Sequence, residues 1–410
     1  MKKLLLVLLI LSLFINHLNA NEKDLNIIQK DKKEYRLLEK ESIQTRQQSQ
    51  KYDWISPIDL SGNIGKNHSF SDENSRNLNN KNTKSASIGF TQSIFESGGI
   101  GFKMDYADNR FKYEMLSWEN QNSQLIYTIY NTLLDIKKLK LEINQNEYRI
   151  VNKDIELIIK KIQYEAGKTD IIELNNAIMS KNLILKEEIA LKNSLKEKEQ
   201  ELAKYTDLKY EEIEILDFQE TNKDIFLDKN YSILEADAKV EMLNSEYKIK
   251  KSQYLPKLSL SAKASYSSQD EKFNSMISDT NKDDATSSGS LILSMPLYDY
   301  TKSSKIQESK IEVLKQKALV NDLKNEIAFE YEQIFTKIDT YLKQNETINK
   351  NIKLYEELIG ANKISSEAGM TSKYDLEILE NTKTINEFDI LINKINILQQ
   401  YAKLYFKIKN

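Results

Sequence analysis

The sequence contains no cysteine, and among its 410 residues there are only three prolines, ten glycines and two histidines. Without cysteine the chain has no disulfide, no thiolate metal site and no lipid-bearing N-terminal cysteine. His17 lies within the first 20 residues, which we interpret below as a secretory signal, and His68 lies in a stretch rich in Ser and Asn, where a solvent-exposed loop is expected. We find no nucleophile–base pair, phosphate loop or metal-ligand spacing. The sequence therefore predicts neither an enzyme nor a cofactor.

Neither sign of charge dominates, since 59 basic and 62 acidic residues are interspersed and the net charge is -3. No basic block indicates a nucleic-acid partner. The one long apolar run, Leu4–Ile15, follows two lysines and precedes a small-residue site that ends at Ala20. It is too short to cross a ~30 Å hydrocarbon core as a helix, which needs about 20 residues. We therefore interpret residues 1–20 as a cleaved secretory signal rather than as an uncleaved anchor.

The scarcity of proline and glycine leaves six long stretches without a helix breaker. Rich in Leu, Ile, Lys, Glu, Gln and Asn, they predict long helices. The stretches are Glu22–Tyr52, Phe102–Ala166, Thr169–Tyr205, Lys229–Tyr254, Asp299–Ile359 and Thr371–Asn410. As a single helix, Phe102–Ala166 would be about 100 Å long. No globular core covers such a rod, so other helices must cover it lengthwise.

Apolar residues repeat every seven positions along these stretches. Phe102–Ala166 carries two rows, namely Ile129, Ile136, Ile143, Ile150, Leu157 and Tyr164, and Tyr127, Leu134, Leu141, Tyr148, Ile155 and Ile162. The rows are offset by two residues, or roughly 200° around a helix, and so lie on nearly opposite sides. A helix with two opposed seams has a neighbour on each side. This favours a wall of coiled-coil helices over a core helix in an ordinary bundle.

Four segments alternate between apolar and polar residues. Their apolar positions are Ile58, Leu60 and Ile64; Ala86, Ile88, Phe90 and Ile94; Leu258, Leu260, Ala262, Ala264 and Tyr266; and Leu291, Leu293, Met295 and Leu297. Such alternation is typical of transmembrane β-barrel strands, although two soluble hairpins packed on helices would show it too. The polar stretches Ser71–Lys84 and Ser268–Ser287 are predicted to be loops in water. Four strands cannot close a barrel, so we expect three chains to supply twelve.

The chain also repeats itself. Glu165–Thr169 recurs as Glu367–Thr371 at an offset of 202 residues, and Thr91–Glu96 recurs as Ser294–Asp299 at an offset of 203. This indicates an internal duplication. We predict a first repeat over 21–206, with a hairpin at 54–96 and a turn at 165–170, and a second over 229–410, with a hairpin at 256–298 and a turn at 367–372. The segment 207–228 joins them and is expected to form part of a belt around the helices.

In this order the elements resemble the TolC-like outer membrane efflux protein family over nearly all of the mature chain. The most specific segments are Ala236–Leu260 and Leu291–Tyr298, together with the turns at Gly167 and Gly369. The resemblance implies a homotrimeric export duct in the outer membrane of a Gram-negative bacterium, in which a 12-stranded barrel continues as an α-helical tunnel through the periplasm. It also implies a periplasmic adaptor and an inner-membrane pump of the RND, ABC or MFS type as partners, in efflux or type I secretion.

The two helical turns carry the candidate site. Asp170 and Ser372 are good helix N-caps, and Glu173 and Asp375 follow three residues later, as in a capping box. The resemblance implies that these two acids face the lumen at the periplasmic mouth, where three-fold symmetry would form carboxylate rings that favour cations. Glu377 could contribute. The adaptor-docking residues implied are Gly167, Thr169, Asp170, Gly369, Thr371 and Ser372, although tight helix connections with a C-cap glycine also explain them.

One departure from the resembled family concerns the closed mouth. Well-known members hold it shut with an Arg and a Tyr, and the matching positions here are Thr371 and Ser366. Neither forms a bidentate ion pair, so a closed state would rest on coiled-coil packing. The alternative functions are a periplasmic adaptor, which needs one hairpin flanked by Gly-rich β-domains, and an exported coiled-coil structural protein, which would lack the four alternating segments.

Overall fold

The computed structural model describes residues 25–69, 79–214, 216, 218, 220–270, 282–367 and 371–409. The predicted signal segment and Gly369 lie outside these residues. The chain forms two compact units. The helical unit comprises the residues up to Lys40, Leu116–Leu234 and the residues from Asn321 onward, and the sheet unit comprises Glu41–Met115 and Glu235–Val320. No helix in the described part of the chain combines the length and the apolar character needed to cross a membrane.

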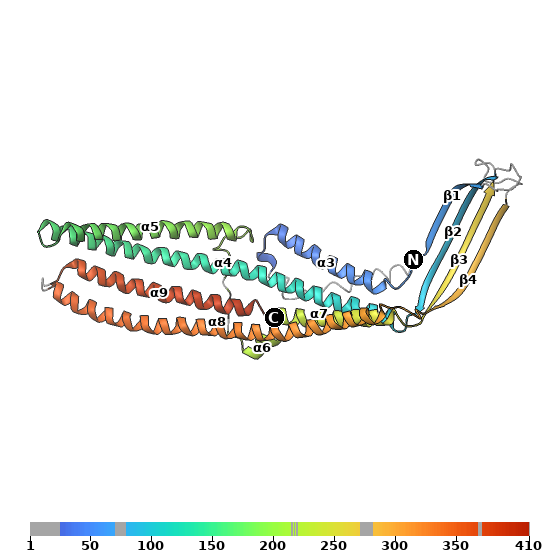
Figure 1. Cartoon of the computed structure of the whole chain (residues 1–410). Coiled ribbons are helices and arrows are strands. Elements are labelled where there is room, and N and C mark those ends of the chain that lie inside the picture. The colour runs from blue at the N-terminus through green and yellow to red at the C-terminus, as the bar shows by residue number, and fades with distance from the viewer. Residues whose placement is uncertain are drawn as a thin grey trace, which may run out of the picture. The chain divides into compact units, whose positions relative to one another are not determined.

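The predicted long helices are all present (Figure 1). They are α3 (Lys30–Tyr52), α4 (Gly99–Glu165), α5 (Ile171–Leu202), α7 (Tyr231–Ser252), α8 (Lys302–Glu367) and α9 (Lys373–Tyr405), with a 3-10 turn η2 (Leu25–Ile27) and a short α6 (Lys223–Asp228). Two predicted bounds differ most from the structure. The first helix begins at Lys30 rather than at Glu22, and α8 continues through Gly360 to Glu367 rather than ending at Ile359. A glycine costs a helix only about 1 kcal/mol, which a helix of this length tolerates.

The two apolar rows of α4 are buried in the middle of the helical unit. Ile129, Leu134 and Ile136 have no exposed surface, whereas Ile162 and Tyr164, near the turn, are 54% and 42% exposed. On the α8 side a second core forms from seven buried residues of α6, α7, α8, α9 and the C-terminal end. They are Phe226, Ile233, Ile327, Ile334, Ile338, Leu404 and Ile408. Within one chain the middle of α4 is therefore covered, whereas its end toward the turn is not, and α8 also leaves apolar side chains such as Phe329 and Leu342 exposed.

The segment that joins the two halves packs against the C-terminal end of the chain. Phe218 stacks edge-on against both Tyr130 and Phe406, with ring centroids 5.9 and 5.6 Å apart. The backbone N–H of Tyr231 donates to the carbonyl of Lys407 at 2.9 Å. These contacts fix the end of α9 beside the start of α7 in the helical unit.

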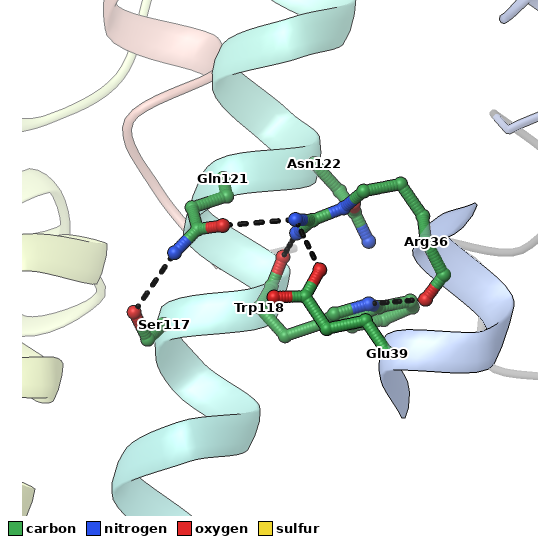
Figure 2. A network of polar contacts seen from close by, with 6 residues as sticks. All are labelled: Arg36, Glu39, Ser117, Trp118, Gln121 and Asn122. Carbon is green, nitrogen blue, oxygen red and sulfur yellow. Dashed lines mark hydrogen bonds and ion pairs between the residues drawn. The ribbon is translucent and has the colours of Figure 1, made fainter. Parts of the chain in front are cut away.

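A buried polar network joins α3 to α4 (Figure 2). The Arg36 guanidinium donates to Asn122 Oδ1 at 2.5 Å, Glu39 Oε2 at 2.6 Å, Gln121 Oε1 at 2.8 Å and the Trp118 carbonyl at 2.9 Å. Trp118 Nε1 in turn donates to the Arg36 carbonyl at 2.8 Å. Arg36 is 8% exposed and Trp118 is 3% exposed. One arginine, which donates hydrogen bonds to four acceptors, thus holds α3 against α4.

The sheet unit holds one antiparallel sheet in the order β1-β2-β3-β4. Its strands are β1 (Asp59–Ser69), β2 (Asn79–Phe95), β3 (Lys257–Asp270) and β4 (Lys282–Ser294). The strands extend into both stretches predicted as loops, which was wrong at 79–84, 268–270 and 282–287, because cross-strand pairing continues there despite the polar sequence. Met295 and Leu297 were also wrongly placed in a strand, since β4 ends at Ser294, before Pro296, which has no N–H to donate.

The two faces of the sheet differ as the alternation predicts. On one face Leu60, Ile88 and Ala264 lie in one cross-strand row, and Leu60 is 79% exposed. On the other face hydroxyls pair across the strands, with Ser61 Oγ 2.8 Å from Ser87 Oγ and Ser265 Oγ 2.8 Å from Thr286 Oγ1. The predicted fold class, mainly helical with a small four-stranded sheet, is confirmed. The apolar face is left uncovered in the single chain.

Candidate functional site at the hairpin turns

The first turn connects α4 to α5 through a left-handed glycine. Gly167 has φ 67, the Gly167 N–H donates to the Tyr164 carbonyl at 3.0 Å, and the Lys168 N–H donates to the Gln163 carbonyl at 2.8 Å. This pair of bonds is the Schellman arrangement that ends a helix, and it favours glycine at the left-handed position. The left-handed backbone conformation at the end of α4 therefore accounts for the glycine at this position, as expected of a C-cap glycine. A half-exposed Thr169 separates it from the start of α5.

Asp170 caps α5 as predicted, because its carboxylate accepts the Glu173 N–H at 2.9 Å. The second half of the predicted capping box does not form. Instead of returning to the cap, the Glu173 carboxylate accepts a hydrogen bond and an ion pair from Lys160 Nζ of α4 at 2.9 Å. The pair spans the hairpin, with the side chains 36% and 52% exposed. Glu173 is therefore partly neutralised within its own hairpin.

The second turn connects α8 to α9, and Ser372 caps α9. Its Oγ accepts from the Tyr374 N–H at 3.1 Å, rather than from the N–H of Asp375. Thr371 Oγ1 donates to the Asn362 carbonyl at 3.5 Å. Ser366 is a half-buried residue of α8. These contacts fasten the start of α9 to the end of α8, as a tight connection requires.

The two hairpins differ in which acidic residue pairs with a lysine of the facing helix. Lys363 corresponds to Lys160 at an offset of 203, but it pairs with Glu380 at 3.3 Å, one to two helical turns beyond Asp375. This leaves Asp375 and Glu377, both exposed, outside the cross-hairpin pair. The sequence analysis missed both lysines, although the repeat offset could have identified them. Of the three predicted acids, Asp375 and Glu377 keep their charge available to solvent.

Amide side chains bind the two hairpins to each other along α4 and α9. Gln145 Nε2 of α4 donates to Asp389 Oδ1 of α9 at 2.6 Å, and Asn152 Oδ1 accepts from Asn381 Nδ2 at 2.9 Å. A third rung joins Gln399 Nε2 to Asp135 Oδ1 at 2.7 Å. The residue numbers rise along α4 as they fall along α9, so these helices run antiparallel in one register. Both turns consequently lie at the same end of the helical unit (Figure 1).

This arrangement can act electrostatically on ions. The end of the helical unit presents carboxylates on the first turns of α5 and α9, where helix dipoles stabilise negative charge. Repeated around a symmetry axis, such carboxylates form a ring that attracts cations. In the described part of the chain no cluster of His, Cys, Asp and Glu could hold a metal ion.

The chain was compared with known protein families, curated proteins and solved structures. Residues 224–403 match the family model described as outer membrane efflux protein. No curated protein matches the sequence. Several solved structures share the fold at low identity, and in the three described next the alignment covers most of each chain.

The first is the outer membrane channel CmeC of Campylobacter jejuni, with 12% identity, a TM-score of 0.69, and 93% of this chain and 86% of that chain covered. The second is the outer membrane protein VceC of Vibrio cholerae, with 12% identity, a TM-score of 0.71, and 93% and 94% covered. The third is the open state of the outer membrane channel MtrE of Neisseria gonorrhoeae, with 11% identity, a TM-score of 0.68, and 94% and 88% covered.

Proposed function

We propose that the chain is a trimeric, passive export duct of the TolC-like outer membrane efflux protein family, because residues 224–403 match the model of that family and solved outer membrane channels share the fold. The duct lies in the outer membrane of a Gram-negative bacterium and continues through the periplasm. It works with a periplasmic adaptor and an inner-membrane pump, in efflux or type I secretion.

The two-faced sheet is the observation that carries this proposal. Its apolar face is widely exposed, with Leu60 at 79% and Leu293 at 73%, whereas hydroxyls cover the other face. Apolar side chains directed at lipid and polar side chains directed at a water-filled lumen account for both faces. Four strands give too small a sheet to close, and three copies give twelve strands, which leaves an open passage. A closed ring of three copies requires cyclic symmetry.

The duct and the alternative functions give different experimental results. A trimeric duct predicts that the purified protein in detergent has three times the mass of the chain by native mass spectrometry, and that it conducts ions across planar bilayers. A periplasmic adaptor or an exported coiled-coil protein would dissolve without detergent and would not conduct. Cross-linking in cells, followed by identification of an adaptor and a pump in the same complex, would test the partners. A soluble monomer without conductance would contradict the proposal.

We place the periplasmic mouth of the duct at the two turns, with Asp375 and Glu377 as its free carboxylates and Glu173 as a paired one. The turns, from Gly167 to Asp170 and from Gly369 to Ser372, then face the adaptor. Support comes from their common position at one end of the helical unit and from the antiparallel rungs that hold them there. Since Thr371 and Ser366 make no ion pair, the closed state would depend on helix packing and on the amide rungs.

Removal of the mouth carboxylates should weaken cation preference. For the double variant Glu173→Ala with Asp375→Ala, we expect the cation-to-anion permeability ratio to fall about two- to ten-fold at ~0.1 M salt, because six unit charges leave a narrow aqueous passage. Trimers should persist, since both residues are exposed. The measurement is the reversal potential across a salt gradient in planar bilayers.

Lys160 provides the matched control for this experiment. The variant Lys160→Ala with Glu173→Ala removes an ion pair of zero net charge, so its permeability ratio should stay close to that of the unmodified protein. An unchanged reversal potential in the Glu173→Ala, Asp375→Ala variant would show that these two residues do not line the mouth.

A further inference from the structure

The polar face of the sheet carries one oppositely charged pair in its central rows. Asp59 of β1 lies opposite Gly89 of β2, Gly89 lies opposite Lys263 of β3, and Lys263 lies opposite Ser288 of β4. Asp59 and Lys263 thus occupy the same cross-strand row, about 10 Å apart because two inter-strand spacings separate them. Both side chains are exposed. One chain therefore presents one carboxylate and one ammonium on this row.

The rows on either side contain only hydroxyl side chains. Above and below the charged row they are Ser61, Ser87, Ser265 and Thr286, and Thr91, Ser261 and Ser290. No other charge on these three rows of the polar face screens Asp59 and Lys263 or competes with them. They are therefore the groups that a solute meets along the central part of this face.

Gly89 keeps the space between the two charges open. A shallow hollow of ≈ 430 Å³ lies on this face, and Asp59, Gly89 and Lys263 line it together with neighbouring serine and threonine residues and with Pro57, Phe90 and Ala262. A Cβ atom at Gly89 would lie 3.0 Å from the Ala262 carbonyl oxygen and 3.3 Å from Lys263 Cβ, so a side chain there would crowd β3. Without a side chain at position 89, the carboxylate and the ammonium face the same volume of solvent.

We propose that Asp59 and Lys263 together set the charge selectivity of the sheet-lined passage, because each attracts the small ions that the other repels. This inference rests on the proposed function, in which the polar face lines the lumen of a trimer. Three Asp59 and three Lys263 then alternate around the passage. Their fields largely cancel, so this level admits cations and anions alike, and removal of one member exposes the selectivity of the other.

The test is the reversal potential of two single variants and their combination. Lys263→Gln should raise the cation-to-anion permeability ratio, and Asp59→Asn should lower it, each by about two- to eight-fold at ~0.1 M salt, because each variant leaves three unit charges of one sign unopposed at this level of the passage. The double variant should return to the value of the unmodified protein. Ser288→Ala, which changes the same row without changing charge, should have no effect.

The outcomes separate this inference from the proposed function. Opposite shifts in the single variants, with cancellation in the double variant, support the inference. Conducting trimers whose single variants shift in the same direction, or do not shift, would overturn the inference and leave the duct intact. An unmodified protein that forms no conducting trimer would overturn the proposed function, and the inference with it. If a single variant fails to assemble, the double variant can be compared with Ser288→Ala instead, since neither changes the net charge. A permeability ratio of the double variant that differs from that of the unmodified protein would contradict the cancellation of the two charges.

Discussion

Ala264→Arg should prevent the protein from assembling in the outer membrane, whereas Ser265→Arg should be tolerated. The two residues are neighbours on β3 but lie on opposite faces of the sheet, with Ala264 opposite Ile88 and Ser265 opposite Ser87. An arginine directed at lipid near the bilayer midplane costs about 2–4 kcal/mol in a transmembrane barrel, and each trimer would carry three. An arginine directed into a water-filled lumen avoids this cost.

The measurement is the amount of each variant in isolated outer membranes, together with its resistance to protease added from outside the membrane. We expect Ala264→Arg to be nearly absent from the membrane fraction and Ser265→Arg to accumulate at a level similar to the unmodified protein. The reverse result would place the hydroxyl face against lipid. Equal accumulation of both variants would show that neither face contacts lipid, as in the soluble-hairpin interpretation of the alternating segments.

Arg36→Ala should destabilise the helical unit by about 2–4 kcal/mol. Without the guanidinium, Asn122 Oδ1 and the Trp118 carbonyl each lose a donor at a buried position, and an unpaired buried group costs much more than a lost exposed contact. Burial lowers the pKa of Arg36, and the neighbouring Glu39 carboxylate acts in the opposite direction. Arg36→Lys should be intermediate, since lysine keeps the charge but not the planar fork.

Arg46 is the matched control, because it lies on the same helix and pairs with Glu114 at 2.9 Å while its side chain is 44% exposed. Arg46→Ala should cost less than about 1 kcal/mol, as exposed ion pairs usually do. Unfolding can be followed through the emission of Trp118 in a Trp54→Phe background, since the chain has two tryptophans. A red shift in the folded Arg36→Ala protein would report water reaching Trp118. Equal small losses in both variants would show that the network contributes little.

Local patterns in the sequence were sufficient for the elements of this fold. The stretches without proline or glycine predicted the long helices, and period-two alternation predicted the two faces of the sheet, because both signals depend on residues close together in the chain. Where local signals conflict, prediction failed. Gly360 does not end α8, and the strands continue into polar stretches because neighbouring strands pair with them.

The pairings between distant segments could not be predicted from the sequence. Glu173 was expected to complete a capping box, but Lys160 of the facing helix takes its carboxylate. Which acid Lys363 would select, Glu380 or Asp375, depends on helix register and not on residue type. The Arg36 network likewise joins residues more than 80 positions apart. Such contacts depend on how the helices pack against one another. No short stretch of a single sequence specifies that packing.

The claim on which this account depends is that three chains close one barrel, and disulfide trapping between sheet edges tests it most directly. In the single chain β1 and β4 are the two edge strands, so closure must pair β4 of one copy with β1 of the next. Because the chain has no cysteine, any disulfide comes from introduced residues. Ser61→Cys on β1 would be combined in turn with Thr286→Cys, Ser288→Cys or Ser290→Cys on β4, all on the hydroxyl face. Oxidation in membranes should yield a covalent trimer on a denaturing gel for at least one pair and only uncross-linked chains for each single cysteine. Monomers alone for every pair would contradict the closed trimer.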